Sequence, residues 1–200
     1  MVTLGLVREY YDARAPEYDD WYLGRGLFSK RERLGWKQEL AALKRTLVSL
    51  PVAHTLDVAC GTGFLTRHLR GEVVGLDQSA RMLEIARERV PEAAFVCGDA
   101  FALPFTDGAF ERVFTAHFYG HLDHDERLLF LAEAVRVAPE LIVCDAAIRP
   151  DRDREEMQER ILKNGSRWHV YKRFFGAEEL AAEIGGKVIF VGDWVVAARA

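Results

Sequence analysis

A glycine-rich turn that follows a short apolar run is the feature that most constrains the fold of this chain. Residues 55–63 read TLDVACGTG, in which the apolar run around Asp57 passes into Gly61 and Gly63. Such a sequence is typical of a buried strand leading into a helix, and glycine leaves the backbone bare enough for a ligand to approach. We therefore expect an α/β fold with a binding site where this strand ends. The same residues also fit a structural turn with Asp57 as a helix cap.

Short apolar runs alternate with amphipathic stretches over the 200 residues, a pattern typical of a mostly parallel sheet covered by helices. Strands are expected at 52–58, 73–76, 94–96, 112–115 and 141–144. Helices are expected at 29–50, where Ser29 and Glu32 form a capping-box pattern, and at 64–69, 79–90 and 177–184. Asp123 and Glu126 are a second capping-box pattern and should open a further helix.

Two segments near the C-terminus have distinct patterns. Residues 149–173 are highly charged, and we expect an inserted helix and loop there, with 152–160 as a charged, solvent-exposed helix face. The apolar runs 187–191 and 194–197 flank Gly192 and Asp193, which predicts a two-residue hairpin turn. The sheet should therefore end in an antiparallel strand, unlike the sheet of a Rossmann-type dehydrogenase.

The composition is that of a globular protein, with 50% apolar and 29% charged residues. A single domain over residues 1–200 is expected, because a chain of this length buries about 70% of its unfolded surface in one core. The net charge of -4 gives no global basic field, so tight, sequence-independent binding of nucleic acid is not expected.

The N-terminus and the cysteines bear on location. Residues 1–22 alternate charges with aromatics and lack the apolar core of a signal peptide, and no stretch reaches the ~20 apolar residues of a membrane span. Cys60, Cys97 and Cys144 lie in apolar runs without CxxC spacing. We expect a cytoplasmic protein with reduced, structural thiols, no metal site and no membrane span.

Asp57 and Thr66 narrow the class of ligand at the glycine turn. Thr66 stands where a dinucleotide-binding fingerprint has its third glycine. A carboxylate at position 57 would repel a pyrophosphate, whereas a cationic sulfonium group would be favourable beside it. The electrostatics therefore point away from a nicotinamide dinucleotide.

Further acidic and apolar residues extend the same pocket. Asp77 ends the next strand about 20 residues on, where a carboxylate can accept hydrogen bonds from ribose hydroxyls. Met82 is placed to lie against a purine ring, and Asp99, within residues 98–100, to accept from an adenine amino group. Each also has a structural interpretation: Asp77 as a helix N-terminal residue stabilised by the dipole, Met82 as core and Asp99 as a surface turn.

These residues together resemble the class I S-adenosylmethionine-dependent methyltransferases, particularly the small-molecule enzymes of ubiquinone and menaquinone biosynthesis. The resemblance covers nearly the whole chain and is carried by residues 57–63, 76–79, 82–83, 98–100, 103–105 and 110, with an aromatic N-terminal segment at 10–19. It implies a Rossmann-like three-layer sandwich with a seven-stranded, mostly parallel sheet and a C-terminal antiparallel hairpin strand.

The resemblance also implies S-adenosyl-L-methionine as cofactor. Its site would be formed by Tyr18, Asp57, Ala59, Gly61, Thr62, Gly63, Asp77, Gln78, Met82, Gly98, Asp99, Ala100 and Ala116. Backbone groups of Ala59, Gly61 and Ala116 would hold the methionine part, and Tyr18 would bond its carboxylate.

Methyl transfer is an in-line displacement in which positioning and a dry pocket supply much of the rate, so a strong base is not obligatory. For an acceptor that must lose a proton, His117 at the end of the fourth strand is the first candidate base and His121 the second. His117 also fits a wall of the methionine pocket, and His121 a structural hydrogen-bonding role.

The substrate side is predicted from two segments. Residues 167–173 combine cations with aromatics, so Trp168, Tyr171 and Arg173 are candidates to hold an anionic or aromatic acceptor, and 147–175 would form a substrate-side cap. A solvated charged cap is the alternative. Residues 1–50 would form a helical lid whose aromatic cluster covers the cofactor or simply packs on the sheet.

Methyl transfer to a small-molecule acceptor is accordingly the function expected. The alternatives are a non-catalytic S-adenosylmethionine-binding regulatory module and an NAD(P)-dependent oxidoreductase. A protein or nucleic-acid methyltransferase is disfavoured, because residues 116–119 read AHFY in place of an Asn-Pro-Pro-Tyr-type tetrapeptide.

Overall fold

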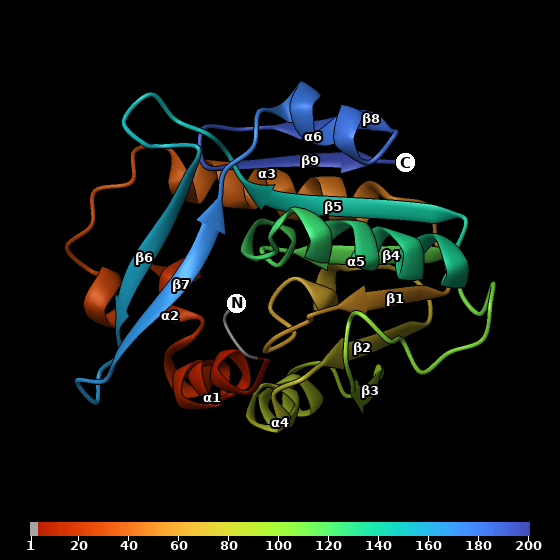
Figure 1. Cartoon of the computed structure of the whole chain (residues 1–200), viewed down its shortest axis with the longest axis horizontal. Helices are drawn as coiled ribbons and strands as arrows, with labels where there is room; N and C mark the ends of the chain where they lie inside the picture. The colour runs from red at the N-terminus through yellow and green to blue at the C-terminus, as the bar shows by residue number, and fades with distance from the viewer. Residues whose placement is uncertain (1–3) are drawn as a thin grey trace.

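The computed structural model describes the backbone of residues 4–200 and the side chains of residues 8–200. A seven-stranded sheet with the order β3-β2-β1-β4-β5-β9-β8 crosses its centre (Figure 1). Strands β1 to β5, which pair in parallel, are β1 (Thr55–Val58), β2 (Val73–Asp77), β3 (Ala94–Cys97), β4 (Arg112–Ala116) and β5 (Glu140–Ala146). At the other edge β9 (Val195–Arg199) runs antiparallel to both β5 and β8 (Lys187–Val191). The expected mostly parallel sheet with an antiparallel end is confirmed.

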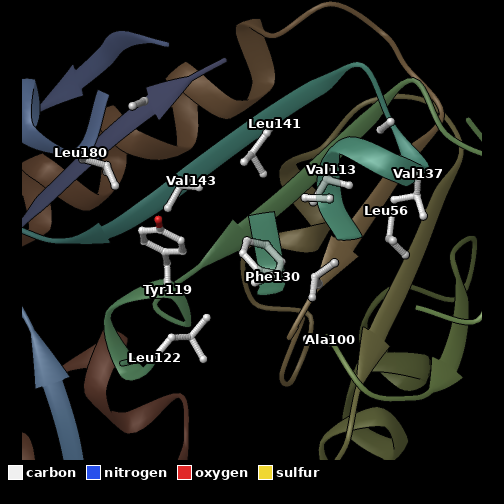
Figure 2. Close-up of a cluster of buried hydrophobic side chains, with 14 of the residues drawn as sticks. Leu56, Ala100, Val113, Tyr119, Leu122, Phe130, Val137, Leu141, Val143 and Leu180 are labelled. Carbon is white, nitrogen blue, oxygen red and sulfur yellow. The ribbon is translucent and has the colours of Figure 1, made fainter. Parts of the chain in front are cut away.

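Helices cover both faces of the sheet, because alternate strand residues point to opposite sides. On one face Leu56, Val113 and Leu141 point from their strands toward Phe130 of α5 (His124–Val137), as Figure 2 shows. On the other face Phe114 belongs to a second cluster with the apolar side of α3 (Trp36–Ser49). The expected three-layer sandwich is confirmed.

Two helix starts follow the capping residues in the sequence. Asp123 accepts from the Glu126 amide at 3.0 Å while Glu126 accepts from the Asp123 amide at 2.9 Å, so the capping box at the start of α5 is present. Ser79 caps α4 (Ala80–Arg89) by accepting from the amide of Met82. The last helix, α6, spans Ala177–Glu183.

The helix expected at 29–50 is present as α3, but its expected start is wrong. Ser29 ends the short 3-10 helix η2 (Gly26–Phe28), and α3 begins only at Trp36, because Gly35 takes a left-handed conformation directly before it. The helix expected at 64–69 is wrong, since only the 3-10 turn η3 (Thr66–His68) is found there. The remaining N-terminal elements are α1 (Leu4–Arg14), η1 (Ala15–Glu17) and α2 (Asp20–Leu23), and η4 is Tyr119–His121. The first three residues of the expected lid lie outside the described residues.

The charged segment 149–173 is a β-hairpin, so the helix expected there is wrong. Strands β6 (Glu155–Ile161) and β7 (Arg167–Arg173) pair antiparallel as a separate two-stranded sheet that lies beside α1 and α2 (Figure 1). Exposure alternates along β6 with the period of two that a strand requires. Its inward positions carry polar residues, Glu156, Gln158 and Arg160, so no apolar alternation marks the strand in the sequence.

The terminal hairpin turn is one residue longer than expected, since β9 begins at Val195 and Trp194 belongs to the turn. Glu39 of α3 accepts from the amides of Asp193, Trp194 and Val195 at 2.8–2.9 Å, which ties the turn to the helical layer.

Cys60, Cys97 and Cys144 are free thiols. Within residues 4–200 no helix has the length and apolar character needed to cross a membrane. The cytoplasmic location stays a prediction.

Candidate functional site

The carboxyl ends of β1 and β4 carry unusual backbone. Ala59, just after β1, has φ of 58° and His117, just after β4, has φ of 56°. L-residues avoid this left-handed region, and such strain concentrates at functional sites. The two strands are neighbours in the sheet, so both strained residues lie at the same edge. This edge is where ligands bind in open α/β sheets.

A first cavity of about 110 Å³ opens at this edge. It is lined by Tyr11, Tyr18, Ala59, Gly61, Leu76, Asp77, Gln78, Met82, Gly98, Asp99, Ala100, Phe101, Ala116, His117, Phe118, His121, Leu122 and Glu126. Most of these residues lie at or just after the carboxyl ends of β1 to β4, and the others come from the N-terminal segment, α4, η4 and the start of α5. Ten of the residues proposed above for a cofactor, all except Asp57, Thr62 and Gly63, are among them.

Asp77 organises the floor of this cavity. Its Oδ2 accepts from the Gly61 amide at 2.9 Å and its Oδ1 from the Ser79 amide at 2.9 Å. Burial raises the pKa of Asp77 to about 6; the hydrogen bonds from Ser79 and Gly61 act against this rise, and the nearby Asp12 carboxylate adds to it. The carboxylate is therefore fixed in direction, and its remaining lone pairs can accept from a ligand.

Gly61 leaves room above the floor. Its φ is +56°, and a Cβ there would lie 3.5 Å from the ring of Tyr18. Any larger side chain would be strained and would project between the turn and Tyr18. The bare backbone at Gly61 keeps this space open.

Three proposed cofactor residues have other partners. Asp57 is buried and accepts from the Thr66 hydroxyl at 2.6 Å, and burial raises its pKa to about 7. It borders a small separate recess of about 10 Å³. The Thr62 hydroxyl donates to Asp19 at 2.6 Å, and Gly63 packs closely on α4.

A second, larger cavity of about 470 Å³ adjoins the first. It is lined by Tyr10, Tyr11, Arg14, Tyr18, Trp21, Tyr22, Phe28, Arg31, Glu32, Arg33, His117, His121, Ala146, Ala147, Arg149, Arg152, Gln158, Arg160, Lys172, Phe174 and Trp194. Tyr11, Tyr18, His117 and His121 line both cavities. Two ligands, one in each cavity, would therefore meet at these four side chains.

His117 and His121 are both neutral at ordinary pH. Burial lowers the pKa of His117 to about 4, and its Nε2 is buried without a hydrogen-bond partner among the described residues. Burial and then the Lys172 ammonium lower the pKa of His121 well below its usual value. The Nδ1 of His121 lies 2.7 Å from the carbonyl oxygen of Tyr171. A carbonyl only accepts, so Nδ1 carries the proton and Nε2 carries the free lone pair.

A buried ion pair stands behind the two histidines. Lys172 of β7 donates to Asp145 of β5, and both side chains are nearly inaccessible to solvent. The second oxygen of Asp145 accepts from the Gly120 amide at 2.7 Å, just before His121. The pair ties the hairpin to the sheet at the wall of the second cavity.

The residues proposed to hold the acceptor lie outside both cavities. Trp168 packs on the ring of Tyr10 at 5.7 Å. Arg173 forms ion pairs with Glu155 and Glu179, and Tyr171 contributes its carbonyl to His121. On the paired strands it is instead Gln158, Arg160 and Lys172 that line the second cavity.

Sequence reasoning missed most of the second cavity. Its arginines come from segments 14–33 and 149–160, which are far apart in the chain. A signal was present in residues 10–36, where arginines are interleaved with aromatic residues. Phe101 and Phe118, missed in the first cavity, directly follow proposed residues.

Comparisons of the sequence find methyltransferases. Residues 56–140 match the family model described as a methyltransferase domain. The chain is 33% identical over 134 residues to the demethylmenaquinone methyltransferase of Thermotoga maritima, covering 64% of this chain and 54% of that protein. It is 44% identical over 100 residues to a dTDP-3-amino-3,6-dideoxy-alpha-D-glucopyranose N,N-dimethyltransferase of Streptomyces fradiae, covering 48% and 37%. The chain thus spans about half the length, or less, of these curated relatives.

Comparison of the structure extends the match to the whole chain. The DhpI–SAH complex superposes with a TM-score of 0.76 at 26% identity, covering 99% of this chain and 97% of that one. Magnesium protoporphyrin IX methyltransferase from Synechocystis, solved with bound SAM, superposes with a TM-score of 0.64 at 17% identity and shares the fold.

Proposed function

This chain belongs to the class I S-adenosylmethionine-dependent methyltransferases, and we propose that it transfers a methyl group from S-adenosylmethionine to a small-molecule acceptor. The observation that carries the proposal is the junction of two cavities at Tyr11, Tyr18, His117 and His121. A cofactor in the first cavity and an acceptor in the second would face each other there.

The polar and apolar groups that line the first cavity match those of S-adenosylmethionine. A fixed carboxylate at Asp77 suits ribose hydroxyls, and the apolar Met82 with the nearby Asp99 suits a purine with an amino group. The open backbone at Gly61 and Ala59 suits the methionine part, with Tyr18 above it. The SAH of the DhpI complex supports this use of the cavity.

The bound cofactor supplies an electrophilic methyl group on a sulfonium, and the chain's residues position and desolvate the reaction. His121 presents the Nε2 lone pair at the junction, so we assign it to accept a proton from an acceptor hydroxyl or amine. His117 forms the wall beside it, 4.9 Å from the ring of Trp21. Neutral histidines at this point also avoid repelling a sulfonium.

We further propose that one domain spans residues 1–200 and that two of its segments close the site. Residues 1–50 would form the helical lid, through Tyr11 and Tyr18, and 147–175 the substrate-side cap, through Arg160 and Lys172. The demethylmenaquinone methyltransferase match supports a small-molecule acceptor. The regulatory-module and oxidoreductase alternatives gain no support from the family match.

Calorimetric titration with S-adenosylhomocysteine tests the proposal. We expect binding that Asp77→Ala and Gly61→Val each weaken at least about tenfold, roughly 1.4 kcal/mol. Gly185→Val is the matched control, because Gly185 also has positive φ, at +72°, but nothing lies within 4 Å of its added Cβ. No binding at millimolar ligand, or unchanged affinity in both cavity variants, would overturn it.

A further inference from the structure

The second cavity carries a large excess of positive charge. Seven cationic side chains line it, against the single carboxylate of Glu32. The cations are Arg14, Arg31, Arg33, Arg149, Arg152, Arg160 and Lys172. The whole chain has a net charge of -4, so composition does not account for this excess. A buried cation without a countercharge or hydrogen-bond acceptor is costly, so the excess needs a physical explanation.

Four of these cations have no carboxylate partner. Arg149, Arg152 and Lys172 pair with acidic side chains at other positions. Within the part of the chain whose side chains are described, no ion pair within 4.0 Å involves the remaining four, which are Arg14, Arg31, Arg33 and Arg160. Arg14 is 9% exposed, so solvent does little to compensate its charge.

Two of the four also hold donors without acceptors. The Nη2 of Arg33 donates a hydrogen bond to the carbonyl oxygen of Trp21 at 2.5 Å, but its Nη1 is buried with no partner among the described residues. Arg160 donates to Gln158, but its Nε is likewise buried and unpartnered. Burial and the positive charge of Arg14 and Arg31 lower the pKa of Arg160, and burial and Arg31 lower that of Arg33. Such groups are normally satisfied in folded proteins.

We propose, on the basis of the proposed methyl transfer, that the acceptor carries a dianionic phosphoryl group. Arg14, Arg33 and Arg160 would hold this group in the second cavity. Guanidinium groups bind such oxygens through paired, charge-assisted hydrogen bonds. Four unpaired cations are better matched by a dianion than by a carboxylate. Aromatic residues, among them Trp21, line the same cavity and can contact an apolar part of the acceptor. The cavity volume of about 470 Å³ suits a small molecule.

Titration of the full chain with inorganic phosphate tests the inference, by calorimetry at constant ionic strength and a pH where phosphate is dianionic. The protein is measured alone and with saturating S-adenosylhomocysteine. Phosphate bound in the first cavity would be displaced by S-adenosylhomocysteine and is recognised by that loss. We expect one saturable phosphate site that remains when S-adenosylhomocysteine is bound. Arg33→Met and Arg160→Met should each weaken it at least tenfold.

Arg167→Met is the matched control, because Arg167 lies on the same hairpin but is exposed and pairs with Glu159. Its phosphate affinity should stay within twofold of wild type. Arg160→Lys should recover part of the loss, and the melting temperature of each variant without phosphate shows that it is folded. Removal of an uncompensated cation should leave that temperature unchanged or higher.

Three results would overturn the inference: no saturable phosphate binding, binding undiminished in folded Arg33→Met and Arg160→Met, or acetate binding as tight as phosphate. Intact S-adenosylhomocysteine binding with any of these leaves the methyltransferase function standing and removes only the acceptor class. Failure of S-adenosylhomocysteine to bind removes the proposed function, whatever the phosphate titration of the free protein shows.

Discussion

The carboxylate of Asp77 accepts a hydrogen bond from the amide of Gly61 over 2.9 Å, which joins the ends of β1 and β2 into one floor. The acid proposed to hold the ribose is thus also the group that fixes the glycine turn. Cofactor binding and the backbone geometry at Gly61 are therefore coupled through the Asp77 side chain, and removing this side chain should affect both.

Affinity for S-adenosylhomocysteine should depend on pH through Asp77. Its pKa in the free protein is about 6, so the carboxyl is protonated below that pH and accepts ribose hydroxyls less well. We expect affinity to fall as pH drops below 6, by at most about tenfold per pH unit. Calorimetry from pH 5 to 8 measures it, and Asp77→Asn should flatten the profile. A wild-type profile that does not change over this range would contradict the role of Asp77.

His121 should remain neutral, with its proton on Nδ1, through the pH range in which a free histidine becomes protonated. Its folded pKa lies well below that of an unfolded histidine, about 6.5. The unfolded chain therefore binds more protons below pH 6.5, and this group costs stability as pH falls. Nitrogen-resolved NMR of the histidine ring reports the tautomer and the titration. Protonation near pH 6.5 would contradict the lowered pKa of His121. A proton on Nε2 in the neutral ring would rule out its assignment as proton acceptor.

Glu39 should stabilise the protein through the β8–β9 turn. One carboxylate accepts from three backbone amides there, and hydrogen bonds to a charged group contribute about 1.5–3 kcal/mol. Glu39→Ala should lower the free energy of unfolding by about that amount in urea denaturation. Gln38→Ala, an exposed neighbour on the same helix, serves as control. Equal stability of the two variants would show that the turn does not need the carboxylate.

Removing one partner of the buried pair Asp145–Lys172 should lower the free energy of unfolding more than removing both charges. Lys172→Met leaves Asp145, which is 0% exposed, without its countercharge, and breaking such a pair costs about 3–5 kcal/mol. The double variant Asp145→Asn/Lys172→Met removes both charges and should regain most of the lost stability. Denaturant melts of the wild type, Lys172→Met and the double variant measure these differences in stability. A double variant no more stable than Lys172→Met alone would show that an uncompensated charge is not the cause.

The first cavity was largely predictable from sequence because its determinants are local. Gly61 marks the turn, Asp77 ends the next strand, and parallel strands bring their carboxyl ends together. The sequence position of Asp57 does not reveal that the Thr66 hydroxyl donates to its carboxylate from the following turn.

The second cavity was not predictable in the same way. Arg160 and Lys172 point inward from a hairpin, yet charged residues in a sequence normally indicate a solvated face. Their environment depends on α1 and α2 packing beside the hairpin (Figure 1), and that arrangement leaves no periodic signal in the residues.

A crystal structure of the complex with S-adenosylhomocysteine is the most direct measurement of the central claim. We predict that both ribose hydroxyls donate to Asp77, and that the sulfur lies where the two cavities meet, beside Tyr18 and His117. Ligand bound elsewhere on the protein, or bound in this cavity with its ribose away from Asp77, would contradict it.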